Sequence, residues 1–188
     1  MSATRKNNRT MMLLLAAVFI LPVILAKLAL DNGWFNQAAT NKGMLLTPPV
    51  DMSVLQTSEQ QPKWKLLYVL PDICALECEN ALYSIAQVRS ALGKESDRAE
   101  VVVVIHEKSN FVQLGLLQEK PNIRLLNTNL KSLQQVFKDE STDGIFIADT
   151  LDNVILRYPL HIDKEQAILH SRDILSDMRK VLKLSRIG

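Results

Sequence analysis

An uncharged apolar run near the N-terminus constrains this chain more than any other feature. Met11–Ala26 carries no charged residue, and Leu28–Leu30 continues the run past Lys27. A helix needs about 20 apolar residues to cross the roughly 30 Å hydrocarbon core of a bilayer. Lys27 is close enough to one end to extend its ammonium to the headgroups, and membrane helices tolerate a proline such as Pro22. Residues 11–30 are therefore predicted to form a single transmembrane anchor.

The charges on the two sides of this run indicate its orientation. Arg5, Lys6 and Arg9 precede it, and the flank that follows is much less basic. By the positive-inside rule, residues 1–10 lie in the cytoplasm and the body of the chain lies outside it. In a bacterium this predicts a single-pass inner-membrane protein whose domain is periplasmic, in a compartment where disulfides persist.

A cleaved signal peptide is the alternative to an anchor, because its charged start and apolar middle look similar. Such a peptide usually ends in small residues at the cleavage site. Here Lys27-Leu28-Ala29 places a lysine or a leucine where a small side chain is needed. We therefore expect an uncleaved anchor, and either reading exports the domain.

Charge and length exclude several classes of function. The 188 residues include 22 basic and 20 acidic side chains, and the first 50 residues hold five of the basic ones but a single acid, Asp31. The slightly acidic remainder argues against nucleic acid as a partner, because phosphate binding needs a concentrated basic face. The chain also shows no Ser/His/Asp grouping, phosphate loop or zinc spacing. Its length suffices for one ordinary domain and an appendage.

Residues 31–62 are predicted to be a linker, since no helical or strand periodicity persists there and Pro48-Pro49 stiffens the middle. The segment Gly43–Val50 is more apolar than a tether requires. Two interpretations remain open for it: an early strand that docks on the domain, or an incidental apolar patch.

The pattern in residues 63–188 predicts a single α/β domain. Helical periodicity follows the first strand, and an unbroken β-branched run at 101–105 is typical of a central strand that is covered on both faces. The order of elements predicts parallel units first and an antiparallel hairpin last. The expected strands are 65–70, 101–105, 122–126, 144–148 and 154–158, and the expected helices are 78–92, 130–137 and a long one that Asp163 caps.

The two cysteines, Cys74 and Cys78, form the chain's most evident chemical site. They lie four residues apart, just past the first strand, where open α/β folds place their sites. If Cys74 sits at a helix N-terminus, the backbone N–H groups and the helix dipole stabilise its thiolate, and Cys78 lies about one turn further on. The pair could close into a disulfide or bind a soft metal ion, for which Cu(I) is the natural candidate.

Two less active interpretations of the cysteines stay open. A purely structural disulfide would stabilise little, because the gain grows with the length of the closed loop. Two inert thiols would be exposed to oxidation in an oxidising compartment. An exchanging or metal-binding pair is therefore favoured.

The segments Trp64–Leu70 and Asp72–Cys78, followed by a helix, resemble the SCO/SenC proteins of cytochrome c oxidase assembly. Val101–Ile105 is similar to the central strand of that family, and Gly144–Asp149 with Asn153–Tyr158 is similar to its closing hairpin. The resemblance implies a membrane-anchored, thioredoxin-like domain that handles copper or thiols. It also implies a respiratory oxidase subunit or another assembly factor as the partner.

The chain departs from that family around the cysteines. Ala75 and Glu79 replace prolines, and Asp143 most closely matches the position of the family's copper-binding histidine. A carboxylate is a hard donor and suits copper poorly. Of the three histidines, His106 ends the central strand on the side of the cysteine loop and is the candidate third ligand, ahead of His161 and His170.

Two functions follow from the sequence. In the first, Cys74 attacks and Cys78 resolves a disulfide, or both hold Cu(I), during oxidase assembly. Thiol–disulfide exchange is favoured over copper storage, and it would make the protein an oxidoreductase; otherwise it is an assembly chaperone without turnover. In the second, the domain is a non-catalytic scaffold of the assembly machinery, and its cysteines are vestigial or bridged.

Overall fold

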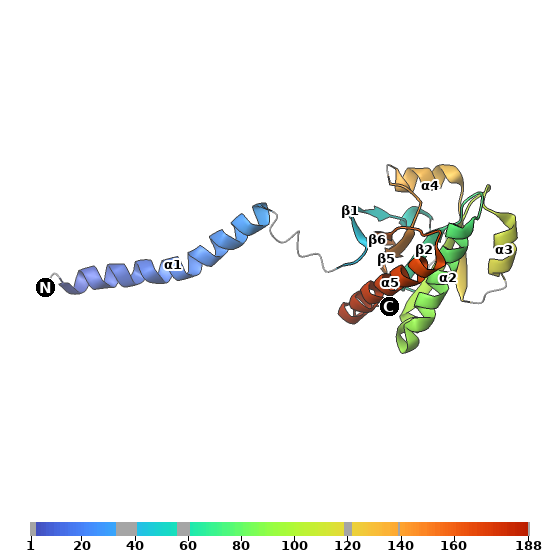
Figure 1. Cartoon of the computed structure of the whole chain (residues 1–188). Coiled ribbons are helices and arrows are strands. Elements are labelled where there is room, and N and C mark those ends of the chain that lie inside the picture. The colour runs from blue at the N-terminus through green and yellow to red at the C-terminus, as the bar shows by residue number, and fades with distance from the viewer. Residues whose placement is uncertain (1–2, 33–40, 56–60, 119–121, 139, 188) are drawn as a thin grey trace. The chain divides into compact units, whose positions relative to one another are not determined.

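The computed structural model describes residues 3–32, 41–55, 61–118, 122–138 and 140–187 in two compact units, Met1–Thr40 and Asn41–Gly188. The first unit contains the helix α1 (Ala3–Asp31), which includes Pro22 and is drawn in blue in Figure 1. Its stretch Arg9–Asp31 is long and apolar enough to cross a membrane. The helix covers the whole of the predicted anchor.

The second unit is built on one six-stranded sheet. Its strands are β1 (Met44–Asp51), β2 (Trp64–Val69), β3 (Ala99–Ile105), β4 (Ile123–Asn127), β5 (Ile145–Ala148) and β6 (Asn153–Tyr158). They lie in the order β1-β6-β5-β2-β3-β4. Strand β2 pairs in parallel with β3 and antiparallel with β5, β3 pairs in parallel with β4, and β6 pairs antiparallel with β5 and β1. The predicted α/β class, with parallel units first and a hairpin last, is confirmed.

Strand β1 corrects the predicted linker. Residues 31–62 were expected to be a tether, but β1 pairs with β6 at an edge of the sheet, and the compact unit begins at Asn41. Of the two interpretations of Gly43–Val50, the docked strand is the observed one. The physical reason is burial, because Leu46 and Val50 contribute to the core beneath them.

Helices cover both faces of the sheet (Figure 1). On one face lie α2 (Leu76–Ala91) and α5 (Lys164–Leu184), which contact each other. On the other lie α4 (Leu130–Phe137) and the short 3₁₀ helix η2 (Ser53–Leu55). Helix α4 contacts both β1 and η2. A second 3₁₀ helix, η3 (Gly93–Arg98), follows α2, and α3 (Phe111–Gln118) lies near β4. The sequence pattern did not predict α3.

Side chains of the central strands alternate between two apolar cores. In β3, Val101 and Val103 join the core under α2 and α5, and Val102 and Val104 join the core under α4. This alternation is the two-sided burial that the β-branched run predicted. The long C-terminal helix begins as expected, because Asp163 Oδ1 accepts a hydrogen bond of 2.8 Å from the backbone N–H of Gln166.

Candidate functional site

The two cysteines lie at the junction of β2 and α2 and form a disulfide with a Cα–Cα distance of 5.1 Å. Cys74 stands one residue before the N-cap Ala75, and Cys78 lies in the first turn of the helix. The expectation that Cys74 occupies the helix start therefore needs a small correction, since Cys78 is the cysteine inside the helix. Both sulfurs are at its N-terminal end, where Ala75 offers no side-chain cap to the first amides.

Burial differs between the two cysteines. Cys78 is 2% exposed and belongs to the core beneath α2, whereas Cys74 is half-buried and packs against that core from outside. An approaching reagent therefore meets Cys74 first.

Hydrogen bonds hold the loop that carries Cys74. Leu70 extends the strand pairing by donating its N–H to the carbonyl of Val104 at 2.9 Å. Beyond it, the carbonyl of Pro71 accepts the N–H of Asn110 at 3.0 Å, and the hydroxyl of buried Ser109 donates to the carbonyl of Leu70 at 2.9 Å. The loop is thus fixed to the segment that follows β3.

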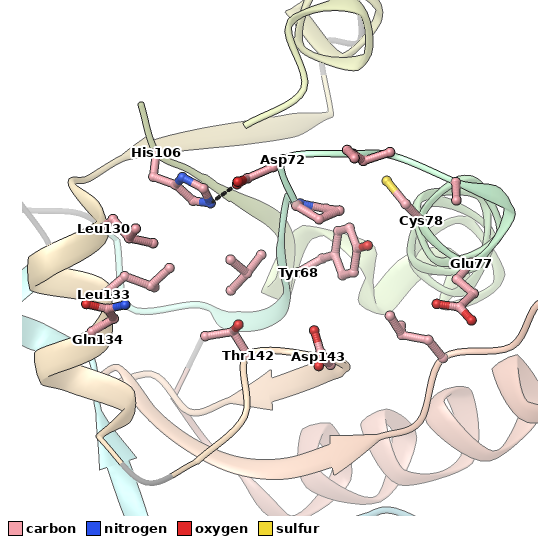
Figure 2. A pocket seen from close by; sticks show the side chains of 15 residues that line it. Tyr68, Asp72, Glu77, Cys78, His106, Leu130, Leu133, Gln134, Thr142 and Asp143 are labelled. Atoms are coloured by element: carbon pink, nitrogen blue, oxygen red, sulfur yellow. Dashed lines mark ion pairs between the residues drawn. The ribbon is translucent and has the colours of Figure 1, made fainter. Parts of the chain in front are cut away.

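A pocket of about 420 Å³ opens beside Cys78, and the neighbours of Cys74 in the chain, Ile73 and Ala75, also line it. Cys78 lines it together with Tyr68 of β2, His106 from the end of β3, Leu133 of α4 and Asp143 from the loop before β5 (Figure 2). The carboxyl ends of β2 and β3 and the loop before β5 therefore converge at one rim of the sheet. This volume lies in the range of ordinary ligand sites.

Acidic side chains surround the opening. Asp72, Glu77 and Asp143 all line the pocket and are exposed, and none of its described lining residues is Lys or Arg. The guanidinium of Arg157 lies near this opening, but it donates to the backbone carbonyl of Asp143, at 2.6 and 2.9 Å, and not to the carboxylate. The carboxylate of Asp143 accepts instead from the hydroxyl of Ser141 at 3.0 Å.

Tyr68 is a functional candidate that the sequence analysis missed. The residue is 1% exposed, yet it lines the pocket, and Figure 2 shows its hydroxyl on the side of Cys78. Burial raises the pKa of Tyr68 above its usual range, and the negative charges of Asp143 and Glu77 raise this pKa further. The phenol therefore stays protonated and can act as a donor. A tyrosine within an apolar strand run was the available signal.

His106 reaches the pocket, as its position at the end of the central strand predicted. Its side chain is 5% exposed, its Nδ1 accepts the N–H of Lys108 at 3.3 Å, and its Nε2 lies 3.8 Å from Asp72 Oδ1. In Figure 2 it stands across the pocket from Cys78. The other two histidines, His161 and His170, stack on each other at 4.1 Å between ring centroids.

The donor set does not fit a three-ligand copper site. Among the described residues, no three His, Cys, Asp or Glu side chains gather closely enough to hold a metal ion. The soft donors Cys74 and Cys78 are bonded to each other, and Asp143 is a hard donor. Once reduced, the two cysteines alone would provide a soft thiolate pair.

A family model described as "Transmembrane-like, thioredoxin-like, C-terminal domain" matches residues 64–185. The chain belongs to this family. The match spans the domain from β2 to the end of α5, so the predicted thioredoxin-like fold is confirmed. The disulfide of this thioredoxin-like domain joins the loop after its first matched strand to the first turn of the following helix.

Solved structures with similar folds include two that carry copper. The Bradyrhizobium japonicum ScoI structure with copper bound has 16% identity and a TM-score of 0.41, covering 60% of this chain and 85% of that one. The Arabidopsis thaliana ScoI structure with copper bound has 15% identity and a TM-score of 0.47, covering 64% and 86%.

A third similar structure is the reduced N-terminal domain of PilB from N. meningitidis. It has 17% identity and a TM-score of 0.37, and the match covers 64% of this chain and 84% of that one. At these identities the likeness concerns the fold. The search among curated proteins found no match.

Proposed function

We propose that this protein is a membrane-anchored thiol–disulfide exchange factor that assists the assembly of a respiratory cytochrome c oxidase. One observation carries the proposal: the Cys74–Cys78 disulfide stands at the helix N-terminus beside an open pocket. A short-loop bridge adds little stability, so its position at an accessible rim favours a chemical role over a structural one.

The exchange begins at the more accessible sulfur. A partner thiolate attacks Sγ of Cys74, a new S–S bond forms to the partner, and the Cys74–Cys78 bond breaks. The electron pair of that bond leaves on Cys78 as a thiolate. Because Cys78 lies in the first turn of α2, the helix dipole stabilises this leaving group.

A second partner thiolate completes the reaction. It attacks the partner's sulfur in the mixed disulfide, forms the partner's own disulfide and releases Cys74 as a thiolate. The partner dithiol loses two electrons and two protons, and the cysteine pair gains them. In the reverse direction the reduced pair reduces a partner disulfide, with Cys74 attacking and Cys78 resolving.

The cellular setting follows from the N-terminal segment and from the resemblance of Trp64–Cys78 to SCO/SenC proteins. The anchor is a single span in the inner membrane, with residues 1–10 in the cytoplasm and the thioredoxin-like domain in the periplasm. The partner is an oxidase subunit or another assembly factor, and it presents cysteines near the membrane surface.

A second candidate function is transfer of Cu(I) by the reduced pair. This function is favoured because the sulfur atoms of Cys74 and Cys78 are soft donors and, as their disulfide shows, lie close enough to bind one ion. Cys74 and Cys78 would hold the ion without a third ligand. Titration of the reduced full chain with Cu(I) against a chromophoric chelator tests it, with the Cys74→Ser, Cys78→Ser double variant as the control.

Single cysteine variants of the full chain test the exchange. In Cys78→Ser, Cys74 remains without its resolving partner, so we expect a mixed disulfide with the physiological partner that accumulates in membranes. The matched variant Cys74→Ser leaves only the buried sulfur, and we expect about tenfold less of this adduct. The double variant should form none and should lower the amount of assembled oxidase.

Normal oxidase assembly in the double variant would contradict the exchange function and favour the scaffold alternative. The reduction potential of the full chain separates the exchange from a structural bridge. A couple well below about −300 mV that does not exchange would indicate a structural disulfide.

A further inference from the structure

The surface around Cys74 combines negative charge with exposed apolar side chains. Ile73 is 80% exposed and Leu76 is 60% exposed, and in the chain they stand on the two sides of Cys74 and Ala75. Asp72 is 58% exposed on its side chain, and Asp143 faces it from another loop of the same pocket (Figure 2). Exposed aliphatic residues beside a reactive sulfur give a partner segment an apolar contact.

An unsatisfied hydroxyl in the pocket also indicates a ligand. Tyr68 is almost fully buried, and its hydroxyl opens into the pocket without a hydrogen-bond partner among the described residues. Because this hydroxyl opens into the pocket and bonds to no described protein group, it is available to donate to an acceptor that a ligand brings. Because the phenol is a donor, the ligand must offer an acceptor, and a peptide carbonyl oxygen is the acceptor that any polypeptide segment brings.

The acidic side chains at the rim of the pocket indicate that its ligand is positively charged. Three carboxylates, those of Asp72, Glu77 and Asp143, line the pocket, and no described lining residue is Lys or Arg. Such a rim attracts cations and repels acidic segments, with an effect on association rate that salt screens.

From these features we infer that the site selects a cysteine-containing polypeptide segment whose flanking residues are Lys or Arg. The partner's cysteine meets Cys74, its basic neighbours lie against the rim carboxylates, and a backbone carbonyl accepts the hydroxyl of Tyr68. This inference rests on the proposed exchange function and assigns it a substrate class.

The test compares two synthetic peptides, capped Ala-Lys-Cys-Lys-Ala and Ala-Glu-Cys-Glu-Ala, as reductants of the Cys74–Cys78 disulfide in the detergent-solubilised full chain. Each rate constant is divided by the same peptide's rate with hydroxyethyl disulfide, which removes the difference in intrinsic thiol reactivity. We expect the normalised rate of the lysine peptide to exceed that of the glutamate peptide by about tenfold at low salt, and this ratio to shrink toward unity at about 0.5 M salt.

Variants that each neutralise one rim carboxylate show which residues cause the preference for the lysine peptide. Asp72→Asn and Asp143→Asn should each lower the ratio two- to threefold, because each removes one of three rim charges. The matched control is Asp97→Asn, an exposed aspartate on η3 beyond the opposite end of α2, which should leave the ratio unchanged.

Equal normalised rates for the two peptides, or a preference for the glutamate peptide, would overturn this inference and leave the exchange function standing. A different result would count against the exchange function itself. If neither peptide nor the small neutral thiol 2-mercaptoethanol reduced the disulfide in the native full chain, the bridge would be structural.

Discussion

The carboxylate of Asp177 accepts a hydrogen bond of 2.9 Å from the hydroxyl of Tyr158 in the interior of the domain. The same oxygen accepts the backbone N–H groups of Lys42 and Gly43, and Oδ1 lies 3.0 Å from the ammonium of Lys180. Burial raises the pKa of Asp177, but the bonds from Gly43, Lys180, Tyr158 and Lys42 together hold it below its usual value. A helix residue therefore fixes the chain that leads into β1.

Replacing this carboxylate should loosen that attachment. We expect Asp177→Ala to lower the free energy of unfolding by about 3 kcal/mol, because it leaves buried donors without their acceptor. Denaturant titration of the full chain measures the loss, and hydrogen exchange should show β1 amides losing protection first. Asp97→Ala, at an exposed site, is the control and should change stability by less than about 0.5 kcal/mol. Unchanged exchange in β1 would contradict the assigned role.

Position 43 requires glycine because its backbone lies very close to the ring of Tyr158. A Cβ there would lie 2.5 to 2.9 Å from ring atoms and the hydroxyl of Tyr158. We therefore expect Gly43→Ala to destabilise the domain by about 1 to 3 kcal/mol. Gly115→Ala is the matched control, because Gly115 is helical and its Cβ would meet nothing within 4 Å. That control should be neutral or stabilising by up to about 1 kcal/mol, and equal effects at the two positions would refute the steric argument.

The stacked histidines predict a pH dependence of stability. Burial lowers the pKa of His161 below its ordinary value of 6.5, and the nearby His170 lowers it further. The unfolded chain then binds more protons than the folded chain as the pH falls through about 6.5, so the free energy of unfolding decreases in that direction. Carboxyl groups with lowered pKa, such as Asp177, lose their contribution only at more acidic pH.

The variant His161→Phe keeps an aromatic ring in the stack and removes the titration. Its unfolding free energy should fall less than that of the wild type between about pH 7.5 and pH 5.5. Denaturant midpoints measured across this range provide the comparison. Parallel curves for the two proteins would exclude His161 as the source.

Removing the hydroxyl of Tyr68 should separate stability from exchange. We expect Tyr68→Phe to change the free energy of unfolding by no more than about 0.5 kcal/mol, because the hydroxyl has no partner among the described residues. The same change should slow reduction by the lysine peptide about threefold or more, since one charge-independent contact is lost. Tyr83→Phe, on the exposed side of α2, should leave the rate unchanged. A normal rate in Tyr68→Phe would exclude the hydroxyl from substrate binding.

Local patterns in the sequence were sufficient to predict most elements of the fold. The β-branched run of β3, the periodicity of α2 and the Asp163 cap each encode one element through contacts within a few residues. The helix α3 was missed because Phe111–Gln118 is mostly apolar, and its two polar residues, Gln113 and Gln118, are too few to reveal a helical stripe. The docking of β1 stayed undecided because its support comes from β6 and α5, more than a hundred residues away.

The amino-acid sequence by itself determined the apolar run that is long enough to cross a membrane, the α/β order and the pair Cys74 and Cys78, since each depends on composition or spacing along the chain. Tertiary structure alone decided that Cys78 is buried while Cys74 is accessible, and that Tyr68, His106 and Asp143 share one pocket with Cys78. These side chains come from three different strand ends. Only the pairing of the strands brings such ends to one rim of the sheet.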